Sequence, residues 1–104
     1  MASDVRLSGP TLKVLKLLLG APRQARSGAE IARATGLGSG TLYPLLARLE
    51  AAGWCESEWE TVNPSEVGRP RRRLYTLTGA GQTRARAAFA DLHLAPAGDL
   101  AWTS

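Results

Sequence analysis

The spacing of apolar residues predicts a first helix that starts near Pro10 and ends at Gly20. Leucines recur three and four residues apart through this segment, so they share one face of a helix. Because Lys13 and Lys16 leave only a narrow polar strip, the helix needs neighbours on more than one side. It is expected to cross the core or to reach into a subunit interface.

Two further helical segments follow, separated by a short turn that contains glycine. Ser27 and Glu30 have the spacing of a capping box, in which each side chain bonds the other residue's backbone amide, and they predict the start of a second helix. Gly36 ends that helix after about two turns, and Leu37 is expected to plug the turn. A short helix, a glycine turn and a second amphipathic helix predict a helix-turn-helix.

The third helix is predicted over residues 39–52, before Gly53. Leucines at positions i, i+3, i+4 and i+7 form its core-facing stripe. The opposite face is small and mostly uncharged, and it carries Gly40, Tyr43, Pro44 and Ala47, flanked by Thr41 and Arg48. Such a face suits insertion into the major groove of DNA. The alternative is a plain surface helix whose first turn is distorted by proline.

After Gly53 the helical period disappears, and residues 54–60 and 71–78 are predicted to form a β-hairpin. Residues 61–70 contain turn-forming asparagine, glycine and proline. The hairpin tip and its return strand carry four arginines, Arg69, Arg71, Arg72 and Arg73. These predict contacts with DNA phosphates or with an adjacent minor groove. The alternative is that they only keep an exposed sheet edge soluble.

A last helix is expected to start after Thr78, as its cap, and to end before Pro96. Its apolar stripe is small, which suits close helix packing, and we expect it to leave the winged unit and pack against a second copy of the chain. The predicted fold is mainly α with a small β-hairpin. It comprises a winged helix-turn-helix domain (residues 1–78), a C-terminal dimerisation helix (79–95) and a loop-like tail (96–104).

Composition and charge set the broad class of protein. A chain of 104 residues with 44% apolar residues fits one soluble globular domain. The net charge of +4 is unevenly distributed, as in proteins with one surface that faces a polyanion. The apolar runs are too short to cross a bilayer, and the N-terminus has no secretion signal. We therefore expect a cytoplasmic, nucleoid-associated protein with no membrane contact.

The residues give little support for an enzyme. No metal-ligand spacing, phosphate loop or nucleophile motif is present, so we predict no catalytic residue, no cofactor and no metal site. The single histidine, His93, is interpreted as structural or solvent-facing. The single cysteine, Cys55, is interpreted as a small buried residue of a strand rather than as a redox switch.

Two runs of residues resemble the PadR family of bacterial transcriptional regulators. Residues 40–50 begin Gly-Thr-Leu-Tyr-Pro, and residues 68–78 contain Gly-Arg-Pro and Tyr-x-Leu-Thr. The resemblance covers roughly residues 10–92, and the short C-terminal region matches the smaller subgroup. It implies a homodimeric repressor that binds a near-palindromic operator. The third helix would lie in the major groove, and the hairpin, called the wing in this family, would contact the flanking groove. The last helix would form the dimer with help from the first.

The resemblance also implies roles for individual residues. The implied DNA contacts are Ser39, Gly40, Thr41, Tyr43, Arg69, Arg71 and Arg72, with Pro44 shaping the front of the helix. Arg48, at the edge of the same helix face, is a further candidate DNA contact, and Pro44 is counted with this set. The implied dimer interface contains Leu12, Leu15, Leu19, Ala85, Ala88, Phe89 and Leu92. The expected partners are double-stranded operator DNA, a second copy of the chain and a small-molecule effector of unknown identity. Trp102 is a candidate to stack on such an effector, or alternatively an anchor of the tail. The rival function is a winged-helix module that binds proteins without sequence-specific DNA binding.

Overall fold

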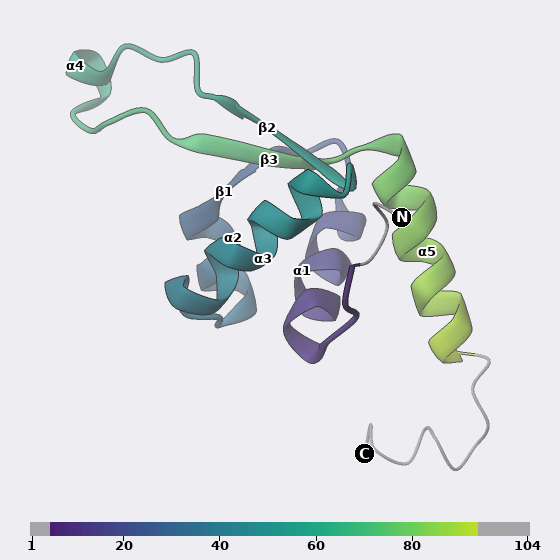
Figure 1. Ribbon diagram of the computed structural model, residues 1–104. Helices are drawn as coiled ribbons and strands as arrows, with labels where there is room; N and C mark the ends of the chain where they lie inside the picture. The colour runs from purple at the N-terminus through teal and green to yellow at the C-terminus, as the bar shows by residue number, and fades with distance from the viewer. Residues whose placement is uncertain (1–4, 94–104) are drawn as a thin grey trace.

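The computed structural model describes residues 5–93, in which helices form the body and a small antiparallel sheet crosses one side of it (Figure 1). The elements follow in the order α1 (Gly9–Gly20), β1 (Arg26–Ser27), α2 (Gly28–Thr35), α3 (Ser39–Ala51), β2 (Cys55–Trp59), α4 (Pro64–Val67), β3 (Arg73–Leu77) and α5 (Gly79–His93). Figure 1 shows α2 and α3 on one side of α1 and α5 on the other, while the β2–β3 hairpin extends beyond the helices as the wing. This arrangement confirms the predicted fold class, a mainly helical winged helix-turn-helix.

The helix-turn-helix forms where local chemistry predicts it. Glu30 Oε1 accepts a hydrogen bond from the Ser27 amide at 2.8 Å, and Ser27 Oγ accepts one from the Glu30 amide at 3.1 Å, so the capping box is present. The helix ends at Gly36, whose φ of 76° lies in the left-handed region that glycine adopts without strain. The third helix begins at Ser39, the predicted residue.

The leucine stripes of α1 and α3 meet in one core. The four leucines of the α3 stripe are at most 2% exposed, and Leu37 packs against the same core from the turn, as predicted. The other members of the core are Val14, Leu15, Leu18, Ile31, Trp54, Cys55, Tyr75, Leu77 and Ala85. Burial of this apolar surface is the main force that holds α3 in a defined orientation.

The sheet has three strands rather than the two that the sequence predicts. Its order is β1-β3-β2 with antiparallel pairing, and the added strand pairs Arg26 with Tyr75 and Ser27 with Leu74. Two residues are too short to show a period of two along the sequence, so only tertiary pairing reveals this strand. Pairing through β3 ties the start of α2 directly to the base of the wing.

The wing tip contains a single helical turn, α4. Its start is capped by Asn63, whose Oδ1 accepts from the Ser65 amide at 3.0 Å. Gly68, with a φ of 73°, ends it. The sequence predicts a turn here, and the structure shows that this turn is helical. The tip therefore carries its own hydrogen bonds although its side chains are exposed.

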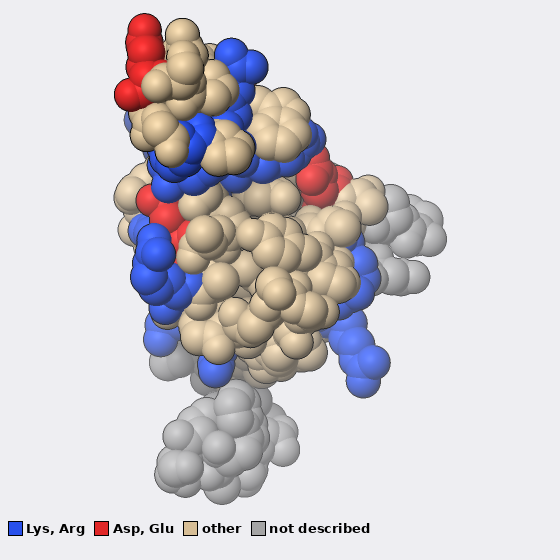
Figure 2. Space-filling view, turned by 90° about the vertical axis from the view of Figure 1, so that its left-hand side faces the viewer, with Lys and Arg blue, Asp and Glu red and all other residues tan. Residues whose placement is uncertain are grey.

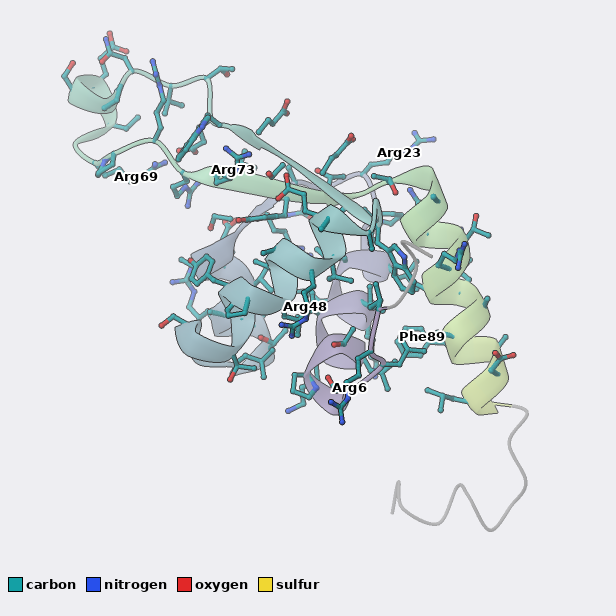
Figure 3. All side chains as sticks on the ribbon, viewed as in Figure 1. Arg6, Arg23, Arg48, Arg69, Arg73 and Phe89 are labelled. Atoms are coloured by element: carbon teal, nitrogen blue, oxygen red, sulfur yellow. The ribbon has the colours of Figure 1, made fainter. Side chains whose placement is uncertain are left out.

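The last helix packs against its own protomer, and the prediction that it also packs against a second copy of the chain stays a prediction. Thr78 Oγ1 accepts from the Gly81 amide at 2.9 Å, so the predicted cap is confirmed. The helix contacts α1 and β3, and Figure 3 shows Phe89 pointing from it towards α1. A helical period shows that one face is buried, but not whether its partner belongs to the same chain. Residues 94 and 95 of the predicted helix, and the tail 96–104 with Trp102, lie outside the described residues.

This placement revises the predicted dimer interface. Leu15 and Ala85 are fully buried within the protomer and Ala88 is 7% exposed, so these three residues have almost no surface left for a partner. The other residues of the predicted interface are half-buried: Leu12, Leu19, Phe89 and Leu92.

Candidate nucleic-acid interface

The front of α3 is open to solvent. All of its predicted DNA contacts are exposed: Ser39, Gly40, Thr41, Tyr43, Pro44 and Arg48. Tyr43 is 45% exposed. Arg48 follows Thr41 by seven residues and Pro44 by four, so the three side chains lie on one side of the helix. The leucine stripe of the same helix is buried in the core, which leaves this front as the surface that α3 offers to a partner.

Proline within α3 adds a backbone acceptor to this surface. Pro44 has no amide hydrogen, so it cannot bond the carbonyl of Gly40 four residues earlier. Both residues are exposed, and the Gly40 carbonyl lacks the helical hydrogen bond that residue 44 would otherwise donate. The absence of a side chain at Gly40 leaves this part of the helix narrow.

Tyr43 rests on the first residue of α2, a contact that the sequence does not predict. A Cβ atom built on Gly28 would lie 2.6 Å from Cε1 and 2.8 Å from Cζ of the Tyr43 ring. Carbon atoms do not approach this closely without repulsion, so glycine is required here for the ring to lie flat against the helix start. The packing holds the Tyr43 ring beside the N-terminus of α2.

Glu60 holds two of the predicted wing arginines. Its carboxylate accepts from Arg69 Nη1 at 2.7 Å and from Arg72 Nη2 at 3.1 Å, and its Oε1 also accepts from the Arg72 amide at 3.0 Å. The Glu60 side chain is 9% exposed, whereas those of Arg69 and Arg72 are 38% and 37% exposed. One carboxylate therefore orders two guanidinium groups whose side chains remain more than one third exposed. Two arginines and one glutamate together leave a net positive charge at this part of the wing.

The same contacts make part of the stability of the wing depend on pH. The hydrogen bonds from Arg69 and then Arg72 lower the pKa of Glu60 from 4.5 to about 2. Since the folded pKa is depressed, the stabilisation is complete above pH 4.5 and is lost as the pH falls through about 2. We expect an NMR titration of the Glu60 carboxyl carbon to show a midpoint near 2. A midpoint near 4.5 would show that the arginines do not bind this carboxylate in solution.

Arg71 and Arg73 lie on either side of this cluster. Arg71 is exposed and donates from Nε to the Val62 carbonyl at 2.9 Å. Arg73 donates from Nε to Ser57 Oγ at 2.9 Å, and its guanidinium carbon lies 5.2 Å from the centre of the Trp59 ring. Figure 3 shows Arg69 near the wing tip and Arg73 closer to the helices, so the cations are distributed along the wing.

The Arg73–Trp59 pair is a feature of the site that the sequence alone did not reveal. The two residues are directly opposite each other in the β2–β3 register, and Trp59 is 57% exposed. A guanidinium stacked on an indole is attracted by the ring's negative face. The sequence does indicate which residues of the first strand lie on the same face as Trp59, because residues 55, 57 and 59 alternate with their neighbours. The strand register is needed, however, to identify Arg73 as the partner.

The wing, α2 and α3 meet at a small groove of about 160 Å³. It is lined by Ser27, Gly28, Ala29, Tyr43, Arg72, Arg73 and Tyr75. Arg72 Nη1 also lies 4.0 Å from Glu30, the capping-box residue, which links the wing to the start of α2. Figure 2 looks onto this side of the molecule and shows a broad uncharged surface with lysine and arginine above it and along both flanks, and with a few acidic side chains among them. Helix α3 and the wing therefore share one face.

Chemistry of other kinds finds little support in residues 5–93. Within them, no group of three histidine, cysteine or acidic side chains lies close enough to hold a metal ion. None of the helices described is long and apolar enough to span a bilayer. The His93 side chain is not described.

Cys55 is buried, as predicted, at 2% exposure. Burial, with a smaller contribution from the charge of Glu50, raises the pKa of its thiol to about 12. Because the thiolate is the reactive form, we expect iodoacetamide to label the native protein far more slowly than the urea-unfolded protein near pH 8. Equal rates in the two states, followed by mass spectrometry, would contradict this burial.

Comparisons with known proteins agree with the fold. AbfR of Staphylococcus epidermidis is 27% identical and superposes with a TM-score of 0.67 over 86% of this chain and 56% of that one. A structure described as reduced AbfR bound to DNA is 26% identical, with a TM-score of 0.69 over 88% of this chain and 61% of that one. ZitR of Lactococcus lactis, at 22% identity, has a TM-score of 0.64 over 85% of this chain and 54% of that one, and supports the fold alone.

The chain thus spans between 54% and 61% of the length of these three structures. No curated protein matches it in sequence. The family model described as the transcriptional regulator PadR-like family matches residues 17–87, which include α2, α3 and the wing. Proteins of that family are regulators and not enzymes, in agreement with the sequence prediction. The chain belongs to the PadR-like family of transcriptional regulators.

Proposed function

We propose that the protein binds double-stranded operator DNA as a homodimer and represses transcription there. In this proposal α3 enters the major groove and the wing contacts the flanking groove. The observation that carries it is the single face on which the mostly uncharged front of α3 lies beside the arginines of the wing (Figure 2). Guanidinium groups suit the phosphate backbone, whereas a narrow polar helix can approach base edges.

The division of labour follows from the chemistry of each element. Thr41 and Tyr43 carry hydroxyl groups on the exposed front of α3, and hydroxyls can donate to or accept from base edges or phosphates. Arg69, Arg71 and Arg72 lie on the wing, where they would neutralise phosphates and position the helix. The structure described as reduced AbfR bound to DNA is 26% identical to this chain, which supports DNA as the partner proposed here.

A second copy of the chain would complete the binding surface. Leu12, Leu19, Phe89 and Leu92 are half-buried along α1 and α5, and Leu7, beside the start of α1, is 44% exposed. Burial of these residues against a two-fold related copy would place two α3 helices on one side of the dimer. Two-fold symmetry in the protein then calls for a near-palindromic operator, with half-sites about 34 Å apart or a multiple of it. Such a protein acts at the nucleoid, in the bacterial cytoplasm.

Titration of the promoter upstream of the protein's own gene tests this proposal. We expect fluorescence anisotropy to show binding that is selective over a scrambled duplex of equal length and that weakens steeply with salt. Footprinting should protect two half-sites, because a dimer presents two recognition helices. Equal, salt-insensitive binding to both duplexes would contradict the proposal and would favour the rival, a protein-binding winged helix.

Two arginine variants sharpen the same titration. Arg71→Ala should weaken binding to all sequences and reduce the slope of log affinity against log salt by about one. Arg84→Ala is the matched control, since Arg84 is also exposed but lies on α5, away from α3 and the wing. The control should leave the slope unchanged.

A further inference from the structure

Trp59 is a large apolar side chain of the wing that the proposed DNA contacts leave unused. It is 57% exposed, whereas tryptophan is highly buried on average in folded proteins. The ring lies at the end of β2, directly opposite Arg73 of β3. Single exposed apolar residues are common on protein surfaces, but this one is held in a defined place beside the proposed DNA interface.

Strand alternation places Trp59 on the face of the wing that is turned towards α3. Side chains two residues apart on a strand share a face, so Trp59 lies on the same face as Ser57 and Cys55. Cys55 is buried in the core, and Ser57 Oγ donates to Glu50 of α3 at 2.7 Å. Glu50 follows Tyr43 by seven residues and therefore lies on the same side of α3. The ring and the exposed front of α3 are thus on the same side of the molecule.

Arg73 connects the Trp59 ring to α3. Its guanidinium carbon, 5.2 Å from the ring centre, is close enough for attraction to the ring face. Its Nε donates to Ser57 Oγ at 2.9 Å, and its Nη2 lies 3.9 Å from Glu50 Oε2. Arg73 also lines the small groove together with Tyr43. A ring held in this way loses little conformational freedom when a further surface covers it, which favours binding.

The charge beside the ring indicates what could cover it. Arg71, Arg72 and Arg73 precede or adjoin the ring on β3 and the wing, and each has a partly or fully exposed side chain. An apolar protein surface would have to desolvate these guanidinium groups at a cost in free energy. The backbone of duplex DNA instead offers phosphates to the guanidinium groups and a sugar to the ring.

We propose that Trp59 is a further DNA-contacting residue, whose ring packs against a deoxyribose of the operator backbone between the groove that receives α3 and the groove that the wing contacts. Arg73 is the positioning residue of this contact. The indole N–H is a donor that can reach a phosphate oxygen of the same backbone. This inference rests on the proposed function and adds an uncharged contact to a wing whose other proposed contacts are arginines.

Replacement of Trp59 tests the contact through affinity and salt dependence together. Trp59→Ala should weaken operator binding about tenfold, and Trp59→Phe, which keeps an aromatic ring, about threefold. Because the indole is uncharged, neither variant should change the slope of log affinity against log salt. A loss below about twofold for Trp59→Ala, or a slope reduced by about one, would overturn the proposal.

Thr76 provides a matched control on the other face of the same hairpin. It lies on β3 one residue from Tyr75, so strand alternation turns it away from Trp59 and α3. Thr76→Ala, an uncharged truncation, should change the operator affinity less than about twofold. A loss equal to that of Trp59→Ala would attribute the effect to general disturbance of the wing and would overturn the proposal.

A double-mutant cycle tests the positioning role of Arg73. Arg73→Gln should weaken operator binding in the wild type and have little further effect in the Trp59→Ala background, because the ring that it holds is already gone. A full further loss in that background would show that Arg73 acts independently of the ring, and its assigned role would be wrong.

Acrylamide quenching of tryptophan fluorescence detects the contact directly in the full chain. Trp59 is exposed and should be quenched readily, whereas Trp54 is 5% exposed. Operator DNA should reduce the quenching of the wild type, because the duplex covers the Trp59 ring, and should leave that of Trp59→Phe unchanged. If the wild type binds the operator and quenching is the same with and without DNA, this inference fails and the proposed function stands. If the wild type binds no duplex, both fail.

Discussion

Replacement of Gly81 by alanine is expected to lower the free energy of unfolding by about 3 kcal/mol or more. A Cβ atom on Gly81 would overlap the carbonyl oxygen of Trp54 and would lie 2.7 Å from its carbonyl carbon. These are backbone atoms at the end of the core, so they cannot turn aside as a flexible side chain would. Helix α5 must move away from α1 and the sheet, which also exposes Ala85. Urea unfolding followed by circular dichroism measures the change.

Gly79 provides a matched control two residues away on the same helix. A Cβ atom built there meets nothing within 4 Å, and Gly79 is exposed. Alanine at this position should therefore be neutral or stabilise the protein by up to about 1 kcal/mol, because glycine loses more backbone entropy on folding. If both substitutions gave the same change in unfolding free energy, the close approach of α5 to Trp54 would be wrong.

Replacement of Gly28 by alanine is expected to weaken operator binding about tenfold or more, given the proposed function, while the fold is retained. The added methyl group would occupy the space of the Tyr43 ring, whose Cε1 atom would be only 2.6 Å away. The end of a tyrosine side chain can rotate outwards, so the loss falls on the DNA-facing surface rather than on the core. Fluorescence anisotropy with operator DNA measures the affinity.

Two controls isolate this effect. Gly9 is likewise the first residue of a helix, α1, and meets nothing within 4 Å of an added Cβ atom; Gly9→Ala should leave the affinity unchanged. In a Tyr43→Ala background, Gly28→Ala should have no further effect, because the ring it displaces is already gone. A full additional loss in that background would show that Gly28 acts by another route.

The wing shows why an arginine cluster is easier to predict than its organisation. A group of arginines near a hairpin tip is visible in the sequence, and so is the acidic stretch before it. Arg69 follows Glu60 by nine positions, and only the hairpin brings the carboxylate to Arg69 and Arg72. The sequence therefore predicts that the arginines contact DNA, but it does not indicate that two of them share one carboxylate.

The sequence by itself determined the elements whose signals are local. The Ser27–Glu30 capping box, the glycine after α2 and the leucine stripe of α3 each act within a few residues, so their spacing predicts helix starts, ends and buried faces. The same spacing placed the exposed front of α3 correctly, since that front is the side opposite the stripe.

Only the tertiary structure decided which elements meet. The strand β1, the Tyr43 ring on Gly28, the Arg73–Trp59 pair and the packing of α5 on α1 all join residues far apart along the chain. A periodic pattern states that a face is buried, but its partner depends on how every other element fills the same core. For that reason the sequence pattern predicted that Ala85 and Ala88 contact a second copy of the chain, whereas both residues are buried within the single folded chain.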